Sequence, residues 1–104
     1  MSAEGHDGTD AEVARLRLEI DAIDDALVPL LEARVRVALA LGAVKRTAGR
    51  PLRDEAREAS VKARLSERLE LLTPQDLERV YATLMALCLD VQERATSRQT
   101  GPLG

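Results

Sequence analysis

Aromatic residues, cysteine and histidine are almost absent from this sequence, and each absence excludes a class of protein. Tyr81 is the only aromatic residue among 104, which argues against a β-sandwich or barrel because strands favour aromatic side chains. The single cysteine, Cys88, excludes an internal disulfide framework and leaves a cysteine-based zinc site without ligands. The single histidine, His6, lies in a polar leading segment. We therefore expect no catalytic triad, no Cys–His pair and no histidine-rich metal site.

A strong excess of one charge and a long apolar run are also missing. The chain has 15 basic and 18 acidic residues and a net charge of -3, whereas general nucleic-acid binding usually needs a basic face. No stretch reaches the roughly 18 apolar residues of a membrane span, and the first ten residues hold no apolar run of the kind found in secretory signals. We therefore expect a cytoplasmic protein that binds neither nucleic acid nor a membrane.

The residues that are abundant predict an all-α fold. Alanine, leucine, glutamate and arginine dominate, and all four are good helix formers. We expect a flexible N-terminal tail over residues 1–10, a single domain over 11–96 and a flexible C-terminal tail over 97–104. Within the domain the pattern predicts three helices.

The boundaries of these helices are marked by turn and capping residues. The first helix is expected from Ala11 to about Thr47, where Ala48-Gly49-Arg50-Pro51 breaks the pattern. The second is expected from Arg53 or Asp54 to about Leu72. Thr73-Pro74-Gln75-Asp76 is a strong start signal for the third helix, which should run to about Ala95.

The first helix carries a heptad-like seam. Apolar residues recur at spacings that alternate between three and four, with one arginine among them. A helix of this length would be roughly 55 Å long, whereas a compact domain of this size has a radius of gyration of about 13 Å. A second copy of the chain is the simplest partner for the exposed remainder. The seam positions are Val13, Leu16, Ile20, Ile23, Leu27, Leu30, Arg34, Val37, Leu41 and Val44.

Arg34 is the one charged residue in the seam, and two explanations are open. It could pair with a carboxylate on a neighbouring helix, or it could belong to an anion site inside the bundle, where a ligand carboxylate supplies the opposite charge. Lys45 lies three turns further on at nearly the same angle around the helix, so the two cations could span a small dianion. Lys45 could instead simply suit the helix dipole. Arg17 lies beside the seam and could reach a pocket in a partner.

The later helices hold further polar candidates, each with a plainer interpretation. Arg50, Arg53 and Arg57 cluster around the start of the second helix, where Asp54 suits the helix dipole, and all could be exposed and solvated. In the third helix Cys88 could be a small core residue. Gln92 follows it by one turn and could be an exposed helix glutamine.

Taken together, these segments resemble the all-helical chorismate mutase family. The resemblance rests on LRLEIDAIDDALVPLLEAR, the spacing of Arg34 and Lys45, GRPLRDEARE, and a third helix that ends in Cys-Leu-Asp-Val-Gln, and it covers about residues 13–94. It implies an intertwined homodimer of three-helix protomers with two active sites, each built from both chains. The reaction implied is the unimolecular rearrangement of chorismate to prephenate, which needs no nucleophile, general base, metal or cofactor.

The resemblance also assigns roles to individual residues. Arg34 and Arg57 would bind the substrate carboxylates, together with Arg17 of the other subunit. Lys45 and Gln92 would hydrogen-bond the ether oxygen of the breaking bond. Three further residues would contact the substrate: Asp54 through its backbone and Glu58 at the ring hydroxyl, with Cys88 where relatives carry a serine that touches a carboxylate.

Three features depart from the family pattern: Pro29 in the middle of the long helix, where proline usually causes a kink; Cys88, a poorer donor than serine; and a short link between Leu72 and Thr73. Other activities stay open. An isochorismate pyruvate lyase or an aminodeoxychorismate mutase of the same fold would use a similar set of residues. A non-catalytic helical dimer that regulates a shikimate-pathway enzyme is the alternative of a different class, and such an enzyme could also be an activating partner.

Overall fold

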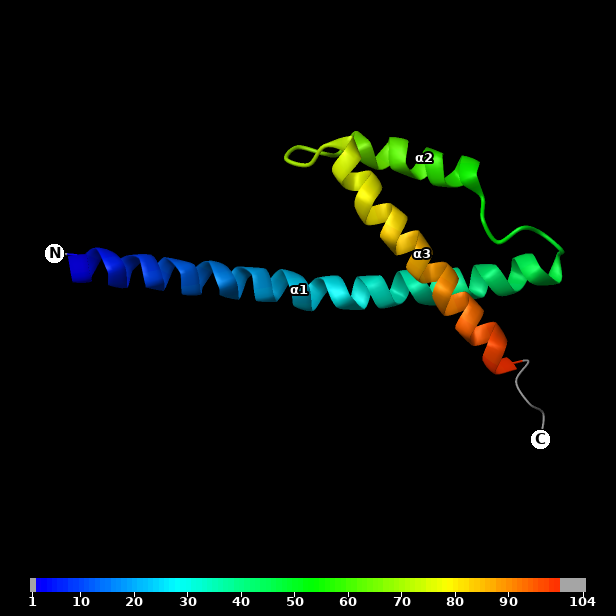
Figure 1. The fold of residues 1–104 in the computed structure, drawn as a ribbon, viewed down its shortest axis with the longest axis horizontal. Coiled ribbons are helices and arrows are strands. Elements are labelled where there is room, and N and C mark those ends of the chain that lie inside the picture. Colours follow the sequence, from blue (N-terminus) through cyan, green and yellow to red (C-terminus); the bar gives the residue numbers. More distant parts are fainter. Residues whose placement is uncertain (1, 100–104) are drawn as a thin grey trace. The chain divides into compact units, whose positions relative to one another are not determined.

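A computed structural model describes residues 2–99 of the chain, with side chains for residues 8–98. Three helices account for nearly all of this range: α1 (Ser2–Thr47), α2 (Glu55–Ser66) and α3 (Pro74–Gln99) (Figure 1). Residues 2–99 contain no strand, which confirms the all-α prediction. The chain divides into two units between Arg34 and Val35, and each unit is described by itself.

The start of α1 corrects the predicted boundary. The helix begins at Ser2, whereas residues 1–10 were expected to be a tail that precedes a helix beginning at Ala11. The first proline of the chain is Pro29, so no residue without an amide hydrogen interrupts the earlier turns. Pro29 itself lies inside the helix without ending it, and its missing N–H leaves the carbonyl of Asp25 without its helical donor.

The apolar stripe of the first unit is uncovered. All residues from Gly8 to Leu30 are exposed. The seam side chains in this range are between 39% and 67% exposed, Val13 the least and Leu30 the most. A stripe of this kind normally lies against another element, because burying apolar surface is the main favourable term in folding and association.

The end of α1 is fixed by a Schellman motif. Gly49 adopts a positive φ of 69°, which glycine tolerates without steric cost. The amide of Arg50 donates to the Lys45 carbonyl at 2.7 Å and the amide of Gly49 donates to the Arg46 carbonyl at 3.1 Å. The predicted break at Gly49 is thereby confirmed, and the chain turns back beside Lys45.

Helix α2 is shorter than expected. Asp54 is its N-cap and accepts a hydrogen bond from the amide of Arg57. The sequence predicted a start at Arg53 or Asp54, and the structure selects Asp54. The helix ends at Ser66, not near Leu72, and the amides of Arg68 and Leu69 then donate to carbonyls three residues back, as in a tighter turn. Residues 67–73 therefore form the link to α3, which is longer than the short link expected.

Helix α3 begins where the sequence predicts. The Thr73 hydroxyl accepts from the amide of Asp76 at 3.1 Å, and the Asp76 carboxylate accepts from the amide of Thr73 at 3.0 Å, a reciprocal capping box. The helix continues to Gln99, past the expected end near Ala95, so residues 97–99 are helical. The rest of the expected C-terminal tail, 100–104, lies outside the described residues.

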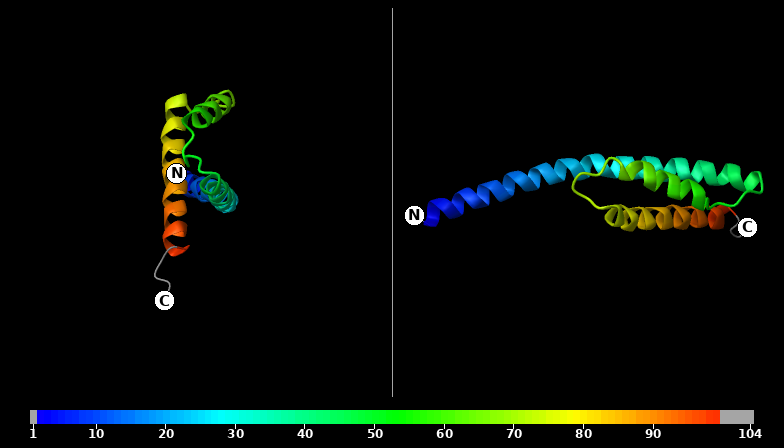
Figure 2. Two further views of the ribbon diagram at one scale, coloured as in Figure 1. Left: turned by 90° about the vertical axis from the view of Figure 1, so that its right-hand side faces the viewer. Right: turned by 90° about the horizontal axis from the view of Figure 1, so that it is seen from above.

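In the second unit α2 and α3 are in contact (Figure 2). Lys62 of α2 and Glu78 of α3 form an ion pair at 2.8 Å, while Leu77 and Cys88 of α3 are buried. Among the described residues no helix is both long and apolar enough to cross a membrane.

Candidate functional site

Lys45, in the last turn of α1, is the first anchor of the candidate site. Its side chain is half-buried, and its Nζ donates to the Leu52 carbonyl at 3.1 Å. Because the Arg50 amide also donates to the Lys45 carbonyl, the loop after α1 is bonded to both the backbone and the side chain of this lysine. Its ammonium is therefore held at a defined place rather than extended into solvent.

Gln92 of α3 is the second anchor. It is only 7% exposed, and its Nε2 donates to the Ala38 carbonyl of α1 at 3.0 Å. Its Oε1 is buried and has no hydrogen-bond partner among the described residues. Because leaving a buried acceptor unpaired costs about 1–3 kcal/mol, this oxygen is a feature that packing alone does not explain. The interpretation of Gln92 as an exposed helix residue is wrong.

A cavity lies beside Gln92. It has a volume of about 370 Å³, within the range of small-molecule sites. Gln92 contributes to its wall, and so does Leu52, whose carbonyl accepts from Lys45. Lys45 does not itself line this cavity, and it is linked to the cavity through its bond to the Leu52 carbonyl. The lining residues are Arg46, Leu52, Gln92, Glu93, Thr96 and Ser97.

At the start of α2 the candidate residues are partly engaged with one another. The Asp54 carboxylate caps the helix by accepting from the Arg57 amide at 2.9 Å. Glu58, whose side chain is 16% exposed, accepts from the Nε and Nη2 of Arg53 at 3.2–3.3 Å. This pairing raises the pKa of Arg53 through its hydrogen bonds and charge attraction to Glu58, with a smaller contribution from Glu55. Arg57 is exposed, and no described residue pairs with its guanidinium.

Cys88 lies one turn before Gln92 and is 6% exposed. It forms no disulfide, and its burial confirms the interpretation as a small core residue. A contact with substrate in place of the serine of relatives stays a prediction.

The remaining candidates, Arg17 and Arg34, belong to the first unit. Arg17 is exposed, and no residue in the described part of the chain pairs with it, whereas Arg34 is half-buried. Their contribution to the site stays a prediction.

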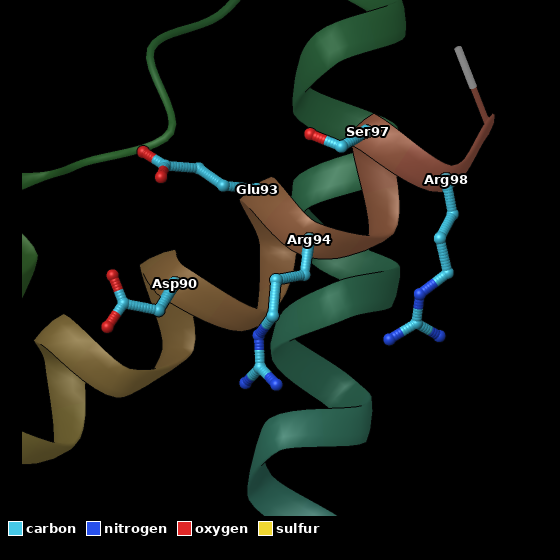
Figure 3. A pocket seen from close by; sticks show the side chains of 5 residues that line it. All are labelled: Asp90, Glu93, Arg94, Ser97 and Arg98. Carbon is cyan, nitrogen blue, oxygen red and sulfur yellow. The ribbon is translucent and has the colours of Figure 1, made fainter. Parts of the chain in front are cut away.

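A second, larger cavity is formed by α3 alone. It is open, has a volume of about 680 Å³ and is lined by Asp90, Glu93, Arg94, Ser97 and Arg98. Figure 3 shows Arg94 and Arg98 extending to the same side of the helix, with no carboxylate bridging them. It shares Glu93 and Ser97 with the wall of the candidate-site cavity, but none of the residues predicted from the sequence lines it.

Three contributors to the site escaped the sequence reasoning: Ala38, Gly42 and Leu52. Arg53 was named from the sequence, but its pairing with Glu58 was not predicted. Ala38 and Leu52 act through their carbonyls, which no residue type signals. Gly42 is buried, and its position four residues after Ala38 on one helix face is typical of a close helix contact. Arg53 precedes Glu58 by five residues, a spacing outside the usual helical pairs. In the part of the chain that the structure describes, no cluster of potential metal ligands is found.

Comparison with known proteins decides the family. The sequence profile described as chorismate mutase type II matches residues 16–93. The chain belongs to this family. All candidate residues of the chorismate mutase type II chain, from Arg17 to Gln92, lie within the matched range.

A curated relative of this chorismate mutase type II chain is the bifunctional chorismate mutase/prephenate dehydratase of Aquifex aeolicus (strain VF5). It is 28% identical over 96 residues, which cover 88% of this chain and 26% of the relative. The chain thus spans about a quarter of the length of that relative. No solved structure matches this chain.

Proposed function

We propose that this chain is a chorismate mutase that rearranges chorismate to prephenate. The observation that carries the proposal is the buried Gln92 amide in the wall of a cavity that Leu52 also lines, the residue whose carbonyl holds the Lys45 ammonium, in a chain of the chorismate mutase type II family. The reaction requires donors at the ether oxygen, where negative charge grows as the C–O bond breaks. Both side chains are donors.

Each of these donors keeps hydrogens for a ligand. The Lys45 ammonium has three hydrogens, of which the bond to the Leu52 carbonyl uses one. The Gln92 amide has two, of which the bond to the Ala38 carbonyl uses one. The protein bonds orient both groups before substrate arrives, so stabilising the developing charge requires little reorganisation.

The rest of the proposed mechanism is orientation. One C–O bond breaks and one C–C bond forms within the same molecule, with no proton transfer and no covalent enzyme intermediate. The chain therefore has to hold a flexible dianion in its reactive conformation. Arginine suits this task because its planar fork matches a carboxylate. Arg34 and Arg57 take this role in our proposal, while Glu58 and the backbone of Asp54 hold the ring hydroxyl.

We further propose that the active unit is a homodimer, in which Arg17 of the partner subunit completes each site. The exposed seam of α1 supports this, because several large apolar side chains, Ile23 and Leu30 among them, are more than 60% exposed in one chain. A second copy would cover an identical stripe with its own.

The test is the loss of chorismate absorbance with purified protein, with products resolved by chromatography. Prephenate formed at a rate proportional to protein concentration supports the proposal. If chorismate is unchanged, the same assay with isochorismate follows, and pyruvate with salicylate would identify a lyase instead. Aminodeoxychorismate is the third substrate. A chain inactive on all three would refute an enzymatic function for it alone and favour a regulatory dimer.

A further inference from the structure

Gly42 lies directly beneath the Gln92 amide. A Cβ placed on Gly42 would be 3.0 Å from the Gln92 Cδ, 3.2 Å from Oε1 and 3.4 Å from Nε2. Contacts of 3.0–3.4 Å are tighter than nine in ten real Cβ contacts. Any residue other than glycine would therefore displace this amide by a few tenths of an ångström.

The amide has little freedom to yield. Its Nε2 donates a hydrogen bond to the Ala38 carbonyl, one turn before Gly42 on the same helix. Gln92 is only 7% exposed. A displacement would lengthen that bond or turn the Oε1, which has no partner among the described residues. Gly42 also lies three residues before Lys45, so the surface that seats the amide and the lysine bonded to Leu52 come from one stretch of α1.

We propose that Gly42 is a positioning residue, which sets the location of the Gln92 amide for the reaction. This inference rests on the proposed function. Glycine is a poor helix former and alanine the best, so helix stability alone would favour alanine at position 42. The absent side chain instead provides the space in which the amide lies.

The test compares G42A with G8A, a matched change in the same helix. A Cβ placed on Gly8 would have nothing within 4 Å, so G8A should keep the wild-type kcat. G42A should lower kcat about tenfold with KM within about twofold, because the displaced group acts on the reacting oxygen rather than on substrate binding. In a Q92A background G42A should change kcat less than about twofold, since there is no amide left to displace.

A second readout does not depend on activity. The chain has three glutamines, Gln75, Gln92 and Gln99, and no asparagine, so a ¹⁵N spectrum contains only three side-chain amide pairs. The Gln92 pair is identified by its loss in Q92A. G42A should shift this pair and leave the other two in place, and G8A should shift none.

The outcomes separate this inference from the proposed function. A G42A protein with wild-type kcat and an unmoved Gln92 signal overturns the inference, and so does an equal loss of kcat in both backgrounds. Should G42A not fold, G42A/Q92A must fold if the clash with the amide is the cause, and an unfolded double variant also overturns it. A wild-type chain without turnover refutes the proposed function, and the amide signal still decides whether Gly42 seats Gln92.

Discussion

Replacing Lys45 by methionine separates charge stabilisation from folding. Methionine keeps most of the apolar stem and removes the ammonium, together with its 3.1 Å bond to the Leu52 carbonyl. That bond is half-exposed, so its loss should lower the free energy of unfolding by only about 1 kcal/mol. A preorganised donor at a developing negative charge contributes about 3 kcal/mol to the transition state, so kcat should fall roughly 100-fold.

Lys62 is the matched control, since these two are the only lysines of the chain. Its side chain is 23% exposed and pairs with Glu78 at 2.8 Å, between α2 and α3. Lys62→Met should lower the free energy of unfolding by about 0.2–1 kcal/mol and leave kcat unchanged. Initial rates of chorismate loss at saturating substrate and urea denaturation of both variants give the two quantities.

The two variants should therefore be alike in stability and differ strongly in rate. A folded Lys45→Met protein with kcat within about threefold of wild type would refute the role of Lys45 at the ether oxygen. Equal losses of kcat in both variants would show that rate follows the packing of the helices, not the charge at this position.

Three further predictions concern the loop, the start of α2 and the dimer. Gly49→Ala should lower the free energy of unfolding by about 1–2 kcal/mol in urea, because φ is 69° there; an unchanged value would show that the turn readily adopts another conformation. Arg53→Gln should lower kcat/KM about tenfold by releasing Glu58 from its bidentate partner, and Arg53→Lys should recover part of the loss. An Arg53→Gln protein with wild-type kcat/KM would show that Glu58 does not depend on Arg53. Mixing Arg17→Ala with Arg34→Ala chains should restore about a quarter of wild-type activity, since half of randomly paired dimers are mixed and each has one intact site; no recovery despite proven subunit exchange would refute the shared site.

The helix boundaries that the sequence predicted correctly are those marked by a side chain with a local partner. Thr73 and Asp76 cap α3 through bonds within four residues, and Gly49 supplies the only left-handed residue of the described chain. Such helix ends can be predicted because the capping residue and the backbone group it bonds are close together in the sequence. The end of α2 was missed because the leucine-rich stretch after Ser66 continues a helical composition, whereas its backbone amides bond three residues back.

Candidate site residues could be named from the sequence, but their partners could not. Lys45, Asp54, Glu58 and Gln92 were all named, yet two of them, Lys45 and Gln92, are held by groups that the sequence does not mark. Carbonyl oxygens of Leu52 and Ala38 hold Lys45 and Gln92, and every residue has a carbonyl. Only the folded chain selects which carbonyl faces each candidate side chain.

The seam of α1 shows a different limit. Its alternating spacing was legible in the sequence, and in a single chain its side chains remain exposed, from Val13 at 39% to Val37 at 68%. A periodic apolar stripe predicts which face of a helix is buried, but the surface that covers this face need not belong to the same molecule. Arg17 and Arg34 lie beside and within this stripe, so their task depends on whatever covers it. If the cover is a second copy, both arginines gain the desolvated surroundings in which a guanidinium binds a carboxylate strongly, and the mixed-dimer experiment measures that gain directly.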